Sequence, residues 1–274
     1  MRIDGPDGQP LNTYGPAVAR KRAEHLGVST VSVFNMYADL RPSRARPPLT
    51  LALIGDFITG AIHEENAVNA AMPPEDAADF AYKLLRDTCD YVIRWAAPSS
   101  AQFVLRVGNH GRTTKKNHAV AKRGFNHETT IYRRLRDYFG DEHRGCPLSW
   151  YDPPEQGGYG YAPLSFGRVG RYMHGEEIEY RGGVGGLYAP LATRVARWNT
   201  EPGAQNALSF FGHHHTFCAA DMALGNGSLI GHSALGRGFS APFEPPCQAM
   251  AVVSPYNTRG FLATHRLMVE SAPG

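Results

Sequence analysis

The stretch "LTLALIGDF" (residues 49–57) places a run of apolar residues directly before a glycine and an aspartate. An apolar run of this length, closed by a glycine turn, is typical of a strand buried on both faces of a sheet. A second stretch, "AQFVLRVGNHGR" (101–112), has the same layout and leads into Asn109 and His110. Both predict a strand that ends at a polar residue, and ligands of α/β sheets bind at such strand ends.

Two later stretches repeat this layout, "RYMHGE" (171–176) with His174 and "FGHHHT" (211–216) with three consecutive histidines. The adjacent glycines let the backbone turn sharply and let a substrate approach. Each stretch alone also fits an ordinary turn, so the prediction depends on four such strand ends occurring together. One aspartate, one asparagine and several histidines suit a divalent ion such as zinc, iron or manganese.

The three histidines differ in their expected roles. If residues 213–215 are extended, alternate side chains share one face of the backbone. His213 and His215 would then point together, whereas His214 would point away and either orient a metal ligand or have a structural role.

The remaining pattern predicts a layered α/β domain with mixed sheets over residues 1–274, because helices and strands alternate early and strands dominate late. Pro16 suits a helix start and Gly27 a helix end. The last two predicted strands could pair through "SPYNTRG" (254–260). The predicted helices span 16–27, 74–97 and 127–138; the predicted strands span 49–55, 101–108, 165–173, 207–211, 227–231, 247–253 and 260–268; and 144–164 is predicted to be an extended loop.

The composition is that of a globular protein, with 42% hydrophobic and 19% charged residues among 274. No apolar run approaches the roughly 20 residues of a membrane helix, and the N-terminus has no basic-then-apolar signal pattern. We therefore expect a cytoplasmic protein without a membrane partner. The four cysteines are far apart and form no CxxC pair, so we expect reduced thiols without a disulfide partner.

The order GD, GNH, H and GHxH resembles the calcineurin-like metallophosphoesterase superfamily over about residues 10–270. The phage-type branch is the most similar, through "GDFITGAIHEEN", "GNHGRTTKK", "HGEEIEYRGGVGG" and "GHHHTF…NGSLIG". This resemblance implies a four-layer sandwich of two mixed β-sheets flanked by helices. It also implies a hydrolase that cleaves a phosphodiester or phosphomonoester with hydroxide generated by two divalent metal ions.

The resemblance also implies roles for the individual residues. Asp56 corresponds to the carboxylate that bridges the two metals, and His215 to a ligand of the first metal. Asn109, His174 and His213 would complete the shell of the second metal. His110 would lie near the phosphate, where it protonates the leaving oxygen or stabilises charge. The ions would be manganese, iron or zinc.

One family motif is missing. The family begins with a DxH motif at the end of its first strand, but Asp4 and Asp7 are not followed by a histidine at that spacing. Either the start is misplaced or truncated, so that the first strand and DxH lie upstream, or the protein is a one-metal or inactive relative. We expect the first alternative, because the other ligands are present. Loss of an internal strand would leave an open sheet edge, so a longer form should be more stable and more active.

A second departure follows GNH, where many family members carry an acidic residue and this chain has Gly111 and Arg112. Arg112 could hold a phosphate through its bidentate fork or be an ordinary surface arginine. His63, in "HEEN", could orient a metal ligand through a hydrogen bond, or simply begin a helix.

A basic stretch follows the GNH motif and could track a nucleic-acid backbone, although such runs are more often solvated surfaces. Its candidate contacts are Lys115, Lys116, Lys122 and Arg123. The preferred substrate is therefore a nucleic acid or a nucleotide. The rival interpretation is a non-catalytic module that binds nucleic acid through this stretch.

Overall fold

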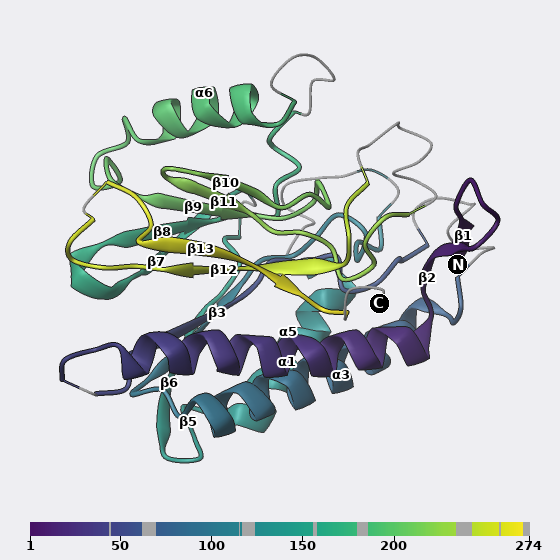
Figure 1. Ribbon diagram of the computed structural model, residues 1–274, viewed down its shortest axis with the longest axis horizontal. Helices are drawn as coiled ribbons and strands as arrows, with labels where there is room; N and C mark the ends of the chain where they lie inside the picture. The colour runs from purple at the N-terminus through teal and green to yellow at the C-terminus, as the bar shows by residue number, and fades with distance from the viewer. Residues whose placement is uncertain are drawn as a thin grey trace.

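The computed structural model describes residues 1–274 except 44, 62–69, 115, 117–123, 156–157, 180–185, 234–242, 258 and 271–274. Its described part is an α/β structure with four α-helices and several sheets (Figure 1). The helices are α1 (Pro16–Asp39), α3 (Pro74–Ala96), α5 (His127–Phe139) and α6 (Tyr188–Trp198), with a short 3-10 turn at Ser165–Gly167. The strands are β1 (Arg2–Asp4), β2 (Pro10–Thr13), β3 (Leu49–Leu53), β4 (Ala101–Leu105), β5 (Glu142–His143), β6 (Cys146–Tyr151), β7 (Gly160–Pro163), β8 (Val169–Tyr172), β9 (Leu208–Phe211), β10 (Cys218–Ala220), β11 (Ala223–Gly225), β12 (Cys247–Val252) and β13 (Ala263–Met268).

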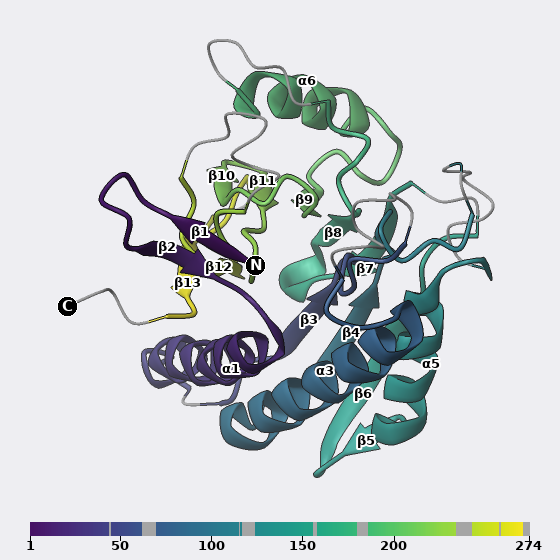
Figure 2. The same cartoon turned by 90° about the vertical axis from the view of Figure 1, so that its right-hand side faces the viewer.

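The first sheet has the order β3-β4-β6-β5. Its strands β3, β4 and β6 are parallel, and the short β5 is antiparallel. Helices α1, α3 and α5 lie together on one side of this sheet (Figures 1 and 2). The predicted strands at 49–55 and 101–108 are thus confirmed, as are the helices at 74–97 and 127–138.

The second sheet has the order β10-β11-β9-β8-β7, with parallel pairs at its centre and antiparallel pairs at both ends. Helix α6 covers its outer face (Figure 1). Strands β12 and β13 form a separate antiparallel pair, as predicted. The α/β class with mixed sheets is therefore confirmed, in a layered arrangement compatible with a sandwich.

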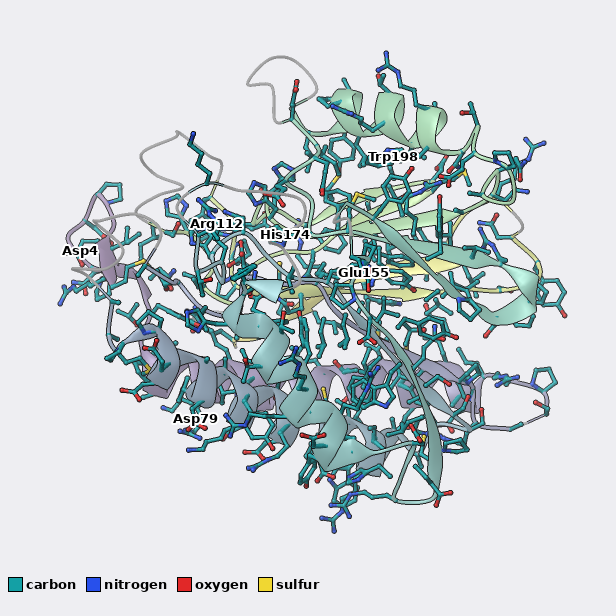
Figure 3. The ribbon with its side chains drawn as sticks, turned by 180° about the vertical axis from the view of Figure 1, so that it is seen from behind. Asp4, Asp79, Arg112, Glu155, His174 and Trp198 are labelled. Atoms are coloured by element: carbon teal, nitrogen blue, oxygen red, sulfur yellow. The ribbon has the colours of Figure 1, made fainter. Side chains whose placement is uncertain are left out.

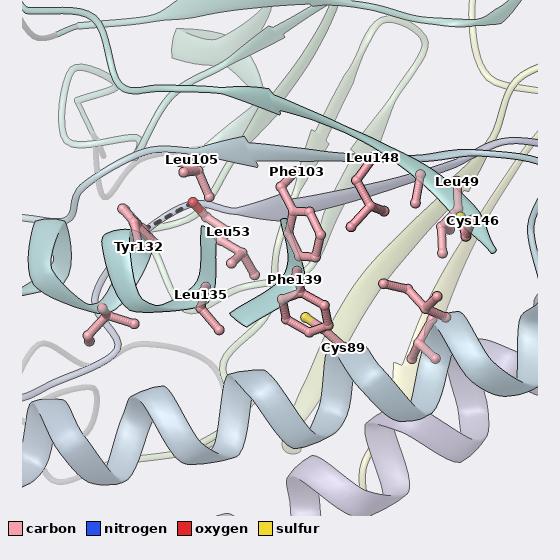
Figure 4. Packing of buried hydrophobic residues seen from close by; sticks show 14 of the residues in the cluster. Leu49, Leu53, Cys89, Phe103, Leu105, Tyr132, Leu135, Phe139, Cys146 and Leu148 are labelled. Carbon is pink, nitrogen blue, oxygen red and sulfur yellow. Dashed lines mark hydrogen bonds between the residues drawn. The ribbon is translucent and has the colours of Figure 1, made fainter. Parts of the chain in front are cut away.

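The largest core cluster lies between the first sheet and its helices (Figure 4). Phe103 of β4 is fully buried and stacks on Trp150 of β6 at a centroid distance of 4.3 Å. The Tyr132 hydroxyl of α5 donates to the Arg106 carbonyl at 2.6 Å, which fixes the helix against the end of β4. The carboxyl ends of β3 and β4 are thereby held by a rigid core.

Helix α1 is twice as long as predicted, because Gly27 is not its end. The helix continues to Asp39, and a Cβ added at Gly27 would lie 3.1 Å from Cδ1 of Tyr91 on α3. Gly27 therefore allows α1 and α3 to approach closely. A glycine that packs against a neighbouring helix cannot be distinguished in sequence from a glycine that ends a helix.

Other differences concern the second half of the chain. Residues 144–164 contain β6 and β7 instead of a continuous loop, because strand pairing overrides the Gly- and Pro-rich composition. The strand expected at 227–231 is absent, and the pairing strand is β11, at Ala223–Gly225. Helix α6 and the β1–β2 hairpin were not predicted. The strand expected at 165–173 begins only at Val169.

The described helices include none that combines the length and apolar character of a membrane span. The four cysteines are buried and free, so no disulfide joins them. Burial raises the pKa of the Cys89 thiol to about 12, which keeps it protonated at neutral pH.

Candidate metal centre

Four of the predicted ligands come together between the two sheets. Asp56 and Asn109 follow β3 and β4 of the first sheet, whereas His174 and His213 follow β8 and β9 of the second. His174, labelled in Figure 3, lies at the meeting point. Its Nε2 is 3.1 Å from Asp56 Oδ2, 3.0 Å from Asn109 Oδ1 and 3.2 Å from His213 Nδ1. Side chains that lie up to 157 positions apart in the sequence, Asp56 and His213, thus meet at one place.

Hydrogen bonding determines what His174 offers at this point. Its Nδ1 lies 2.8 Å from the Ile54 carbonyl oxygen, which can only accept, so Nδ1 carries the hydrogen. In the neutral ring, Nε2 then presents a lone pair to Asp56 and Asn109, which present oxygen lone pairs in return. Acceptors that face one another repel unless a proton or a metal cation lies between them. Metal-binding histidines commonly donate their other nitrogen to a carbonyl in this way.

The electrostatics of the centre are consistent with a cation site. Burial by itself raises the pKa of Asp56, but His174 outweighs this effect and holds the pKa below its usual range. Burial likewise lowers the pKa of His174, but the Asp56 charge raises it to about 9. Burial lowers the pKa of His213 to about 4, so that this ring is neutral at pH 7. The centre therefore offers one carboxylate and neutral His213, with a displaceable proton on His174.

Glycines bring the two loops of the first sheet together. A Cβ at Gly55 would overlap the backbone of Gly108, and a Cβ at Gly108 would overlap Asp56. The backbone of Asp56 itself is left-handed, with φ of 57°. This conformation lets Asp56 Oδ1 accept from the His110 backbone N–H at 2.9 Å. The GD and GNH turns therefore act as one unit.

The histidine loop differs from its predicted conformation. His213 and His215 have φ of 66° and 54°, so the segment is not extended and side-chain alternation does not apply. Left-handed non-glycine residues are uncommon and cluster at functional sites. The start of the loop is anchored by the Gly212 N–H, which donates to the His174 carbonyl at 2.7 Å.

The three histidines nevertheless occupy different surroundings. His214 packs edge-on against Phe211 and His213, with ring centroids 6.2 and 5.1 Å apart, so it braces the loop. His215 lines the same cavity as Asp56, His110 and His213. Burial lowers the pKa of His215, which leaves it neutral and able to bind a cation. It lies outside the tight group formed by Asp56, His174 and His213, whose ligand atoms are all within 4.8 Å.

Glu128, in the first turn of α5, is a buried residue of this centre that sequence reasoning missed. Its two carboxylate oxygens accept from the backbone N–H groups of Phe57 at 2.8 Å and Gly108 at 2.7 Å. Burial, followed by the charge of Asp56, raises the pKa of Glu128 to about 7. A glutamate in a first helical turn is ordinarily a surface residue near the helix dipole, so the sequence carries no signal of this role.

Glu128 also explains the glycine after GNH. A Cβ at Gly111 would overlap Asn126 and crowd Cγ of Glu128. The acidic group that the family resemblance places directly after GNH is absent, and Glu128 packs against this position from α5.

Arg112 is half-buried and bonded within its own loop. Its Nη1 donates to the Asn109 carbonyl at 2.8 Å and its Nε to the Thr114 carbonyl at 3.1 Å. These bonds hold Asn109 in place, and they engage two of the nitrogens that a bidentate phosphate contact would use. The geometry therefore favours a positioning role for Arg112.

Lys116 is exposed. The other predicted residues of this group, His63, Lys115, Lys122 and Arg123, lie outside the described residues.

Comparison with models of known protein families finds no match to this chain, and comparison with curated proteins finds none. The proposed function therefore depends on the order of the sequence motifs and on the chemistry of the centre.

Proposed function

We propose that the protein is a metal-dependent phosphoester hydrolase of the calcineurin-like class. The observation that supports this proposal is the convergence of Asp56 Oδ2, Asn109 Oδ1, His174 Nε2 and His213 Nδ1, four atoms that can each offer a lone pair to a metal ion once His174 has lost its proton. One carboxylate, one amide oxygen and two imidazoles form a donor set that suits manganese, iron or zinc.

A second ion is part of the proposal. Asp56 and His215 line the same cavity, and these two residues would hold the second ion. When bound, such a pair of ions lowers the pKa of a water ligand and polarises the oxygens of a phosphoryl group. The negative charge of Asp56 would reduce the mutual repulsion of two neighbouring dications.

His110 is the proposed acid at the leaving oxygen. It lines the cavity beside Asp56 and His215. Its Nδ1 lies 3.0 Å from the Thr59 carbonyl, which orients the ring and assigns the hydrogen to Nδ1. Nε2 is then the nitrogen that exchanges a proton with substrate. The proposed substrate is a nucleotide or a nucleic-acid phosphodiester.

The His110→Asn variant is expected to lower kcat for a chromogenic phosphodiester with Mn²⁺ by about 10²–10⁴-fold, the usual contribution of general acid catalysis. Mn²⁺ affinity should be unchanged, because His110 is not among the metal ligands. The matched control is His25→Asn, which replaces an exposed histidine of α1. Wild-type DNA binding without any turnover would reject the hydrolase in favour of a nucleic-acid-binding module.

Metal affinity is expected to depend on pH through His174. Because the pKa of His174 is raised to about 9, a proton occupies Nε2 at neutral pH and must leave when a metal binds. The apparent Mn²⁺ affinity should therefore rise about tenfold per pH unit between about pH 6 and 8. Titration calorimetry in two buffers of different ionisation enthalpy should detect the released proton, and an affinity independent of pH would contradict this assignment.

A further inference from the structure

Three contacts tie His110 to residues 56–60, which lie just after β3 and which we call the 56–60 segment. The His110 backbone N–H donates to Asp56 Oδ1 at 2.9 Å, and its ring Nδ1 donates to the Thr59 carbonyl at 3.0 Å. The His110 carbonyl oxygen lies so close to Gly60 that a Cβ added there would overlap it. The N–H, the ring and the carbonyl of one residue therefore all contact the same short segment.

The 56–60 segment is anchored along its length. The Asp56 backbone is left-handed, and the Phe57 N–H donates to Glu128 Oε1 at 2.8 Å. Ile58 is 5% exposed and belongs to the core cluster between the first sheet and its helices. Thr59 itself is exposed. Its carbonyl is therefore presented to His110 from a segment that the core holds in place.

Gly60 meets two separate requirements, and only one of them is conformational. Its φ of 65° lies in the left-handed region, where glycine has no steric cost. Gly167 has nearly the same φ, 68°, but no described atom lies within 4 Å of a Cβ added to it. Gly60, in contrast, is buried against the His110 carbonyl. The missing side chain at Gly60 therefore also lets residues 60 and 110 approach closely.

We propose that Gly60 is a positioning residue for His110. Its close contact with the His110 carbonyl brings the preceding Thr59 carbonyl within reach of the imidazole, and that hydrogen bond orients the ring. The catalytic part of this inference rests on the proposed hydrolase function. There His110 gives the proton on Nε2 to the leaving oxygen as the bond between that oxygen and phosphorus breaks.

The consequence is a fixed spacing between the acid and the metal centre. Asp56, the proposed bridging ligand, begins the segment, and Thr59, the acceptor of His110 Nδ1, lies near its end. Because both belong to one anchored segment, the ligand and the acid keep a constant separation. A misplacement of about 1 Å in a catalytic site can lower a rate by about 10²-fold.

The first test uses the metal-free protein and needs no activity. Histidine is isotopically labelled at nitrogen for NMR, and the His110 signals are assigned by their loss in His110→Asn. In the wild type we expect a hydrogen-bonded hydrogen on Nδ1. Gly60→Ala should shift this signal and speed its exchange with water by about fivefold or more, the usual effect of losing one hydrogen bond. An unchanged signal in the folded variant would overturn the proposal.

Gly167→Ala is the matched control, because it imposes the same left-handed strain without overlapping any described atom. We expect the His110 signals of this variant to equal those of the wild type. A change as large as that in Gly60→Ala would show that strain at any such glycine disturbs His110, and the specific role of Gly60 would be rejected.

The second test measures how hydrolysis depends on the leaving group. Methyl p-nitrophenyl phosphate and methyl phenyl phosphate share one phosphoryl group, but phenolate is the more basic leaving group and depends more on protonation. Gly60→Ala should lower kcat with Mn²⁺ by at least about tenfold more for the phenyl ester than for the p-nitrophenyl ester. His110→Asn should show the same pattern. Equal losses for the two esters would indicate a general structural effect and contradict the positioning role.

A second variant decides the question if Gly60→Ala does not fold. Thr59→Gly adds no atom and removes only an exposed side chain, but it gives the Thr59 carbonyl greater conformational freedom. We expect it to fold, to shift the His110 signal in the same direction by a smaller amount, and to show the same leaving-group pattern. An unchanged His110 signal in Thr59→Gly would refute the proposal.

The two tests separate failure of this inference from failure of the proposed function. Wild-type protein that hydrolyses neither ester would reject the hydrolase, and with it the catalytic part of this inference, whatever the His110 signals show. A leaving-group effect in His110→Asn that is absent from folded Gly60→Ala would reject the positioning role alone.

Discussion

Asp56→Asn is expected to lower Mn²⁺-dependent phosphodiester hydrolysis by about 10³-fold or more. The substitution keeps the size of the side chain and an oxygen that can accept from His110, but it removes the negative charge from the metal centre. Charge stabilisation by metal ions contributes several kcal/mol to catalysis, and each 1.36 kcal/mol corresponds to about a tenfold change in rate. Steady-state kinetics measures the loss of hydrolysis, and Mn²⁺ titration measures the loss of metal affinity that follows from the missing charge.

The same variant should change the titration of His174. The charge of Asp56 is what raises the pKa of His174, so burial should dominate in Asp56→Asn and leave the ring neutral near pH 7. The control is Asp79→Asn on α3 (Figure 3), because Asp79 is a partly exposed aspartate that pairs with Lys83 and Arg134. Full activity in Asp56→Asn would exclude this centre from the reaction.

Glu128→Ala is expected to have the largest effect on stability. It would leave the N–H groups of Phe57 and Gly108 without their carboxylate acceptor. An unsatisfied buried donor costs about 1–3 kcal/mol, so the free energy of unfolding should fall by roughly 2–6 kcal/mol. Urea denaturation followed by circular dichroism measures this loss.

Glu75→Ala is the matched control for Glu128→Ala, because Glu75 also lies in a first helical turn but is exposed. We expect it to change stability by less than about 1 kcal/mol. Glu128→Ala should also weaken Mn²⁺ binding, since the GD and GNH turns lose their common anchor. A stability equal to that of the control would show that Glu128 does not hold these turns.

The strand ends could be predicted because their signal is local. A continuous apolar run followed by Gly-Asp or Gly-Asn-His specifies a buried strand and its turn within about ten residues. Parallel pairing of β3 with β4 then places Asp56 and Asn109 at the same edge of the sheet. Their nearness to His174 and His213 was expected from the resemblance to a known family, and it depends on how the two sheets pack.

Glu128 could not be predicted, because its role is set by contacts with residues 20 and 71 positions away. The left-handed backbone of His213 and His215 was likewise hidden, since it depends on the contact between the histidine loop and the turn at His174. In both cases the local sequence had a simpler interpretation. Glu128 fitted an ordinary helix start, and residues 213–215 fitted an extended segment.

The sequence by itself determined the α/β class, the order of the four strand-end turns and the polar residue types that they carry, because these follow from hydrophobic periodicity and residue chemistry. Only the tertiary structure decided that Asp56, Asn109, His174 and His213 meet at one point. It also decided that β3 and β12 line a common cavity. Both depend on the packing of one sheet against another, which brings distant segments together through buried surface that no local pattern encodes.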